Sequence, residues 1–301
     1  MRDWRKVNDN LVKRGFILLD FSFLDRWDEE LALTNKPKAS VKGPKFKYPN
    51  ALFYLAAFLN TLIGFRQVEG VLQGLSKLRK FRVPDYTTIF RRVRRLKLKL
   101  NASKLKDGFI VAIDSSGIKV TNRGEWLRKV GKKKRRGWIK MHVAVDVRKK
   151  RLLALRVTDE KQEDNSEFKN LLNQILEAGK PSKVLADSAY DSRENFNLLA
   201  SLGIVPGIKP RKVEIPKGLR KRKRLGVKAR GSVVRKKSVI EYSLNPKEWK
   251  RKLEYGGRWV AEIFFSAFKR IFGEYVRARR FENMVNELMI KAMLYNLFIS
   301  L

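Results

Sequence analysis

A tyrosine, two cations and a carboxylate near the C-terminus are spaced for one side of a helix. Tyr255, Arg258, Glu262 and Lys269 follow one another at intervals of three, four and seven residues, which places them within an arc of about 60° at 100° per residue. The rest of Trp259–Phe272 is largely apolar, which predicts a buried helix on which charges need a partner or a metal ion. A structural ion pair between Arg258 and Glu262 is the alternative, and this pattern alone leaves both open.

Two aspartates each end a short apolar run that predicts a buried strand. Asp114 follows Phe109 to Ile113, and Asp187 follows Lys183 to Ala186. A carboxylate at such a strand end projects into the crevice where α/β sheets place their ligands, although a single one is often only a turn or cap residue. With Glu262 these residues would form a three-carboxylate cluster. Such a cluster can hold two divalent ions that activate an attacking hydroxyl and stabilise a leaving oxygen.

The residue types available limit which metal could bind. The chain has no cysteine and a single histidine, His142, so thiolate sites, disulfides and multi-histidine sites within one chain are excluded. Carboxylate oxygens suit Mg²⁺ or Mn²⁺. We expect His142 itself to be a packed or hydrogen-bonded strand residue.

The charge balance points to a polyanionic partner. The 301 residues include 69 Lys and Arg against 30 Asp and Glu, a formal charge of +39. Nucleic acid is the commonest such partner, with ribosomal-type binding and membrane-surface binding as alternatives. The N-terminus carries no secretory apolar segment, and the longest apolar stretch, Ala51 to Leu59, is too short for a bilayer span. We expect a soluble cytoplasmic protein, nucleoid-associated in a prokaryotic host, with no membrane partner.

From about residue 108 onwards, the apolar patterns predict an α/β domain with a mixed sheet. Asp191 opens one predicted helix with an Asp-x-x-Glu capping pattern, and it is the nearest substitute if Asp187 is misassigned. The predicted order is three strands, helix, strand, helix, strand and helix. The strands are expected at 109–113, 141–147, 152–158, 183–186 and 204–208, and the helices at 166–178, 191–201 and 259–272.

Residues 1–107 are predicted to be helical and to include a candidate DNA-binding element. Pro84 and Asp85 mark a break and an N-cap before a helix whose buried side carries Ile89 and Val93. A helix, a short turn and a basic helix are the outline of a helix-turn-helix, and a solvated basic helix packed on the catalytic domain is the alternative. The opposite side of this helix carries Arg91, Arg92, Arg94 and Arg95.

These motifs together resemble one protein family. The segment from Tyr255 to Lys269 is similar in residue type and spacing to the YREK signature of insertion-sequence DDE transposases. AIDSSG around Asp114 and VLADSAYDS around Asp187 resemble the two aspartate motifs of that family. VPDYTTIFRRV resembles the N-terminal region of one large branch. The resemblance runs from about Tyr48 to the C-terminus.

The resemblance implies an RNase H-like catalytic domain at 108–301, with a mixed five-stranded sheet flanked by helices and a basic loop at about 211–238. It implies Asp114, Asp187 and Glu262 as catalytic metal ligands for two Mg²⁺ or Mn²⁺ ions. Tyr255, Arg258 and Lys269 would position DNA phosphates, and Lys140 is a weaker candidate for DNA contact. The helical region 1–107 would bind DNA.

The implied activity is cut-and-paste DNA transposition. Members of this family bind the terminal inverted repeats of their element, cleave there, and join the freed 3′ hydroxyl to target DNA as dimers or larger assemblies. A homodimer on double-stranded DNA is therefore expected. A non-mobile nuclease of the same fold and a domesticated DNA-binding relative are the alternatives. The intact acidic triad argues against the second of these, and the YREK spacing and N-terminal region argue against the first.

Overall fold

The computed structural model describes residues 3–36, 44–100, 105–120, 137–211 and 232–301. A second basic segment of the sequence, RKVGKKKRR at 128–136, and most of the predicted basic loop at about 211–238 lie outside these residues. The chain forms two compact units, one of residues 1–99 with 276–301 and one of residues 100–275. Among the described helices, none is both long and apolar enough to cross a bilayer.

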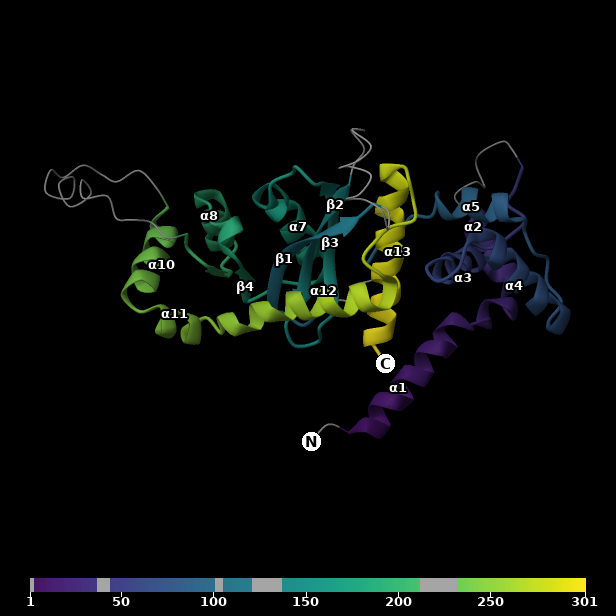
Figure 1. The fold of residues 1–301 in the computed structure, drawn as a ribbon, viewed down its shortest axis with the longest axis horizontal. Coiled ribbons are helices and arrows are strands. Elements are labelled where there is room, and N and C mark those ends of the chain that lie inside the picture. Colours follow the sequence, from purple (N-terminus) through teal and green to yellow (C-terminus); the bar gives the residue numbers. More distant parts are fainter. Residues whose placement is uncertain (1–2, 37–43, 101–104, 121–136, 212–231) are drawn as a thin grey trace, which may run out of the picture. The chain divides into compact units, whose positions relative to one another are not determined.

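The first unit is helical and contains an extended apolar core. Leu52 and Phe53 of α3, Leu72 of α4 and Ile89 of α5 are fully buried in it. Ile290 of α13 belongs to the same core. The elements are α1 (Trp4–Leu18), η1 (Ser22–Leu24), α2 (Trp27–Asn35), α3 (Asn50–Asn60), α4 (Phe65–Leu78), α5 (Tyr86–Val93) and α13 (Phe281–Ile299) (Figure 1).

The predicted start of α5 agrees with the structure. Asp85 is the N-cap, and its side chain accepts hydrogen bonds from the backbone N–H groups of Thr87 and Thr88. Ile89 and Val93 are buried, as their helical spacing predicts. Helices α4 and α5 pack together, which is the outline of two helices joined by a turn.

The C-terminal helix α13 is placed differently from the sequence-based domain boundary. The prediction put everything from residue 108 to the end in one domain, whereas α13 packs with α3 in the first unit. Asn283 of α13 also accepts a hydrogen bond from Arg94 at 2.8 Å. This contact joins residues 189 positions apart, which no local pattern encodes.

The second unit contains the predicted mixed sheet in the order β3-β2-β1-β4-β5. Strands β1, β2 and β3 pair antiparallel, while β4 pairs parallel with both β1 and β5. Flanked by helices, this sheet confirms the predicted RNase H-like architecture. The strands are β1 (Ile110–Lys119), β2 (Trp138–Asp146), β3 (Leu152–Asp159), β4 (Lys183–Ala186) and β5 (Val205–Ile208).

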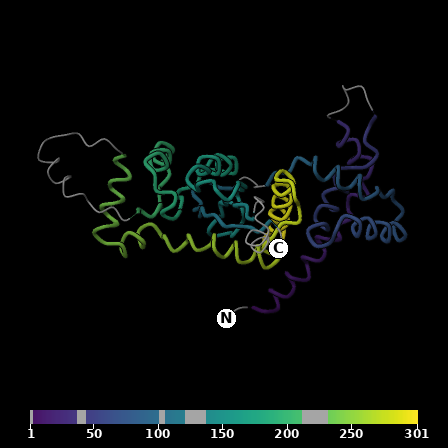
Figure 2. The backbone as a smooth tube through the Cα atoms, turned by 45° about the horizontal axis from the view of Figure 1, so that its top comes forward, coloured from purple at the N-terminus to yellow at the C-terminus, as the bar shows by residue number. Residues whose placement is uncertain are grey.

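Helices cover both faces of the sheet. Val111 and Ile113 of β1 lie in the core shared with α7 and α8. Because side chains alternate along a strand, Asp114 points to the other face, against which α12 packs. Figure 2 shows α7 and α12 on opposite sides of the sheet. The flanking elements are η3 (Asp164–Glu167), α7 (Phe168–Ala178), η4 (Ser188–Tyr190), α8 (Arg193–Ser201), α10 (Val233–Leu244), α11 (Pro246–Lys252), η5 (Tyr255–Arg258) and α12 (Trp259–Phe272).

Two local predictions about α12 and the segment before it were wrong. Tyr255 and Arg258 do not extend α12 but form the separate 3₁₀ turn η5. Helix α12 is not buried on most sides either, because Trp259 is 66% exposed and Ile263 is 39% exposed. Only the side of α12 that rests on the sheet, which includes Phe264 and Phe268, is buried.

Two further predictions concern residues at element ends. Asp114 was expected to end its strand, but it is the fifth residue of β1, which continues to Lys119 because it stays paired with β2. Asp191 was expected to cap α8, but Ser192 is the N-cap and accepts from the N–H of Asn195. The Asp191 carboxylate is engaged elsewhere.

Candidate active site

Strand register brings the two predicted aspartates side by side. Ala112 of β1 pairs with Leu185 of β4 in parallel register. Asp114 and Asp187 each follow this pair by two residues, and Asp187 keeps an extended backbone (φ −79°, ψ −175°). Neighbouring strands lie about 4.8 Å apart, so the two residues are at the same level where β4 ends.

Each of these two aspartates is held by the backbone next to it. Asp187 is the N-cap of η4, and its Oδ1 accepts the N–H of Ala189 at 2.8 Å. Oδ1 of Asp114 accepts the N–H of its neighbour Ser115 at 2.9 Å. In both residues these bonds leave Oδ2 for other partners.

Arg258 lies between Asp114 and Glu262. Its Nη1 is 3.0 Å from Oδ2 of Asp114, and its Nη2 donates to Oε1 of Glu262. The ion pair suggested by the spacing of Arg258 and Glu262 is therefore present, and it includes a third member from β1. Glu262, on the first turn of α12, is thereby connected to the sheet.

Burial and charge crowding act together on Asp114. Burial raises the pKa of its carboxyl, and the negative charges of Asp187 and Glu262 raise it further. The N–H of Ser115 and the guanidinium of Arg258 oppose this rise in pKa. The negative charges that crowd around Asp114 favour a cation at this position.

The three carboxylates are not arranged as a finished metal cluster. Within the described part of the chain, no group of three or more acidic or histidine side chains is placed to hold a metal ion. The predicted convergence is therefore only partial, because the Arg258 guanidinium occupies the position between two of the carboxylates. The donor set itself, which consists only of carboxylates, is the one that Mg²⁺ and Mn²⁺ prefer.

Tyr255 and Lys269, the other two residues predicted to share one side of a helix with Arg258 and Glu262, also contact the sheet. The hydroxyl of Tyr255 donates to the carbonyl of Ala186 at 3.1 Å, and burial raises the pKa of this tyrosine to about 12. This bond ties η5 to the residue before Asp187. Lys269 donates from Nζ to Oγ of Ser116 at 2.9 Å, on the same face of β1 as Asp114. Sequence reasoning missed Ser116, although its place two residues after Asp114 puts it on that face.

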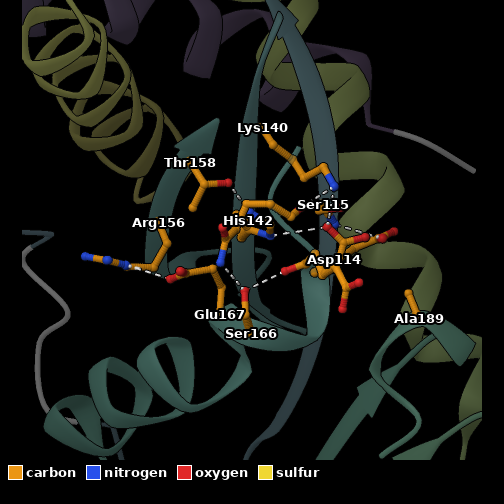
Figure 3. A network of polar contacts seen from close by, with 12 residues as sticks. Asp114, Ser115, Lys140, His142, Arg156, Thr158, Ser166, Glu167 and Ala189 are labelled. Atoms are coloured by element: carbon orange, nitrogen blue, oxygen red, sulfur yellow. Dashed lines mark hydrogen bonds and ion pairs between the residues drawn. The ribbon is translucent and has the colours of Figure 1, made fainter. Parts of the chain in front are cut away.

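Lys140 lies on the opposite face of the sheet from Asp114. It is paired with Gly117 in the β1–β2 register, and its Nζ contacts Oδ1 of Asp164 at 3.1 Å and the carbonyl of Gln162 at 2.8 Å. These contacts place Lys140 in a polar network (Figure 3) and not beside the proposed metal ligands Asp187 and Glu262.

His142 belongs to the same network and is fully buried, which agrees with the expectation of a packed strand residue. Its Nε2 lies 2.8 Å from Oγ1 of Thr158, while burial lowers the pKa of the imidazole. Nearby, Arg156 pairs with Glu167 at 3.0 Å. The network lies beside Ser115, which follows Asp114 and pairs with His142 in the β1–β2 register. It is therefore on the face of β1 opposite to Asp114.

The four arginines of the α5 region divide into two pairs. Arg92 donates to Oδ1 of Asn50 at 2.7 Å and stacks on the ring of Phe46, with its guanidinium carbon 3.7 Å from the centroid. Arg94 donates to Asn283. Both are tied into the first unit, whereas Arg91 and Arg95 are exposed.

The mixed five-stranded sheet flanked by helices is the fold of the RNase H-like class. A family model described as "Transposase DDE domain" matches residues 106–297, more than half of the chain, and a second model with the same description matches residues 12–123. The chain belongs to the DDE transposase family. It is therefore a DNA-cleaving and strand-transfer enzyme, and DDE domains in general use divalent metal ions.

Two solved structures of DNA-processing assemblies also show similarity. One is a simian T-cell lymphotropic virus intasome in complex with the PP2A regulatory subunit B56 gamma, at 18% identity over 65% of this chain and 67% of that chain, with a TM-score of 0.25. The other is the Drosophila P element transposase strand transfer complex, at 12% identity over 91% of this chain and 70% of that chain, with a TM-score of 0.33. At these TM-scores the family assignment depends on the family models.

Proposed function

We propose that this transposase excises and inserts its own insertion sequence by a cut-and-paste reaction, with Asp114, Asp187 and Glu262 as the ligands of two Mg²⁺ or Mn²⁺ ions. The observation that supports this most directly is the β1–β4 register, which sets the two aspartates side by side with Glu262 connected through Arg258. When bound, the ions supply an activated hydroxyl and stabilise the leaving 3′ oxygen.

Arg258 has a specific part in this proposal. Its guanidinium has the fork geometry that recognises carboxylates and phosphates equally well. When a DNA phosphate enters the site, Arg258 exchanges its two carboxylate partners for phosphate oxygens. This exchange removes a competing cation from Asp114 and Glu262 and makes both carboxylates stronger metal ligands when substrate is present. Lys269 of α12, which donates to Ser116 on the same face of β1 as Asp114, provides a second positive charge for the DNA backbone.

The DNA partners follow from the charge of the chain and from the resemblance. The net charge of +39 favours phosphate contacts over a long stretch of duplex. We assign recognition of the terminal inverted repeats to the helical region 1–107, with Arg91 and Arg95 of the α5 region on its exposed surface. The catalytic region 108–301 would take the element end and the target DNA, and two copies of the chain would hold paired ends in the prokaryotic nucleoid.

The test uses a duplex that carries the element end, taken from the DNA flanking the coding sequence, and a scrambled duplex of the same length. Asp114→Asn, Asp187→Asn and Glu262→Gln should each lower Mg²⁺-dependent cleavage by at least about a hundred-fold, the loss expected when a preorganised group at the reacting phosphate is removed. DNA binding should persist. Glu248→Gln, at an exposed position of α11, is the matched control. Normal cleavage by a triad variant would contradict the assignment of that residue, and equal cleavage of both duplexes would favour a nuclease without end specificity.

A further inference from the structure

Asp191 carries a buried carboxylate that the proposed chemistry does not use. Its side chain has no exposed surface, and Arg235 binds both of its oxygens, with Nε at 2.6 Å from Oδ1 and Nη2 at 2.7 Å from Oδ2. The backbone N–H of Arg211 donates to Oδ2 at 2.9 Å. A buried charge is costly unless it is paired and hydrogen-bonded, and here three donors satisfy it.

Arg211 also holds the turn that begins at Asp187. Its Nε donates to the carbonyl of Ser188 at 2.9 Å, and its Nη2 donates to the carbonyl of Ala189 at 3.3 Å. Both residues belong to η4, for which Asp187 is the N-cap and Asp191 the C-cap. The turn is therefore fixed at its two carbonyls by Arg211 and at its far end by Arg235.

The elements that carry these arginines come from different parts of the unit. Arg211 closely follows β5, and Arg235 lies in the first turn of α10, which packs against α8. One carboxylate therefore joins the end of the sheet, the Asp187 turn and the α8–α10 pair. Among the described residues, the side chains of Asp191, Arg211 and Arg235 form no hydrogen bond or ion pair with Asp114 or Glu262.

We propose that Asp191 is a positioning residue, which acts through Arg235 and Arg211 to hold the η4 turn so that the Asp187 carboxylate faces Asp114. This inference rests on the proposed function, because it assumes that Asp187 binds metal. Groups that orient a metal ligand typically change metal affinity by about ten-fold or more when they are removed. Asp191 is thus not a substitute ligand for Asp187 but the anchor of its turn.

The test measures Mn²⁺ binding to the full chain without DNA, by the electron paramagnetic resonance signal of free Mn²⁺. Asp191→Asn should weaken Mn²⁺ binding by about ten-fold. Cleavage should recover towards the parent rate at high Mg²⁺ concentration, because the ligands remain and only their placement is loosened. A general loss of stability would not be rescued by metal in this way, and circular dichroism establishes that the variant is folded.

A second variant avoids the buried ion pair. Arg211→Met keeps the backbone N–H that Asp191 accepts but removes the two donors to η4, and it should weaken Mn²⁺ binding by about three-fold or more, the effect of a net hydrogen bond. Arg193→Met, at an exposed position of α8, is the matched control and should bind Mn²⁺ like the parent.

The outcomes separate this inference from the proposed function. If Asp187→Asn weakens Mn²⁺ binding while folded Asp191→Asn and Arg211→Met bind as tightly as the parent, the anchoring role is wrong and the metal site stands. If Asp187→Asn itself binds Mn²⁺ normally, the metal site is wrong and the anchoring role falls with it. If Asp191→Asn does not fold, the result with Arg211→Met decides.

Discussion

Arg258 reaches Asp114 across 144 positions of sequence, with Nη1 of the arginine 3.0 Å from Oδ2 of the aspartate. The same guanidinium holds Glu262 on its other side. A positive side chain therefore occupies the space between two carboxylates that the proposed reaction requires as metal ligands. In the proposed mechanism, Arg258 competes with the metal when DNA is absent and binds a DNA phosphate when DNA is present.

Replacing Arg258 by Gln should separate these two roles. Mn²⁺ binding without DNA should become tighter, because the competing cation has been removed from Asp114 and Glu262. Cleavage of the element end should fall by about ten-fold or more, because the phosphate loses its fork-shaped donor. The two quantities are measured by Mn²⁺ titration and by a gel-based cleavage assay. Arg251→Gln, an exposed arginine paired with Glu248, is the control. Unfolding of Arg258→Gln would show that the ion pair is structural.

His142 should control how the stability of the protein depends on pH. It is the only histidine of the chain, and burial lowers its pKa in the folded state. The unfolded chain, in which a histidine titrates near 6.5, therefore takes up a proton first as the pH falls. The stability associated with neutral His142 is fully present above about pH 6.5 and is lost as the pH falls below it towards the folded-state pKa.

The measurement is the thermal midpoint of the parent and of His142→Gln between pH 5 and pH 7.5. The parent should lose stability towards pH 5, while the variant, although less stable overall because the bond to Thr158 is lost, should show a shallower pH dependence. Parallel curves for the two proteins would mean that other groups cause the loss.

Neighbouring arginines of α5 should have opposite phenotypes. Arg91→Ala should leave the free energy of unfolding unchanged but weaken DNA binding, and it should reduce the slope of log affinity against log salt by about 1, because one phosphate contact is lost. Arg92→Ala should instead destabilise the protein by about 1 kcal/mol or more, because Arg92 donates to Asn50 and stacks on Phe46. Urea unfolding and a salt series of binding measurements distinguish the two. A normal salt slope for Arg91→Ala would remove that residue from the DNA surface.

The local patterns of the sequence determined much of the second unit. The bounds of α12 and β4 agree with the predicted segments, and Asp85 caps α5 as expected. These features depend on side-chain periodicity and on capping groups within a few residues, so a single stretch of chain contains all the information they need. The order of elements was sufficient to predict the mixed sheet.

Which face each strand residue occupies was decided by tertiary pairing. Asp114 and Lys140 lie on the neighbouring strands β1 and β2. The β1–β2 register and the covering helices nevertheless put their side chains on opposite faces of the sheet. A shift of one residue in register would exchange those faces, and neither strand alone contains that register. The sequence therefore supplied the candidates, and strand pairing selected among them.

The charged partners were likewise fixed only by the fold. Composition and spacing determined that the protein carries a large positive charge and an acidic set suited to a divalent cation. They did not determine that Arg258 bridges Asp114 and Glu262, that Asp191 anchors the Asp187 turn instead of capping α8, or that α13 belongs to the first unit. Each of these contacts joins residues that are far apart in the chain. The geometry of such a contact depends on how whole helices and strands pack against one another in the folded core. No local stretch of sequence contains that information.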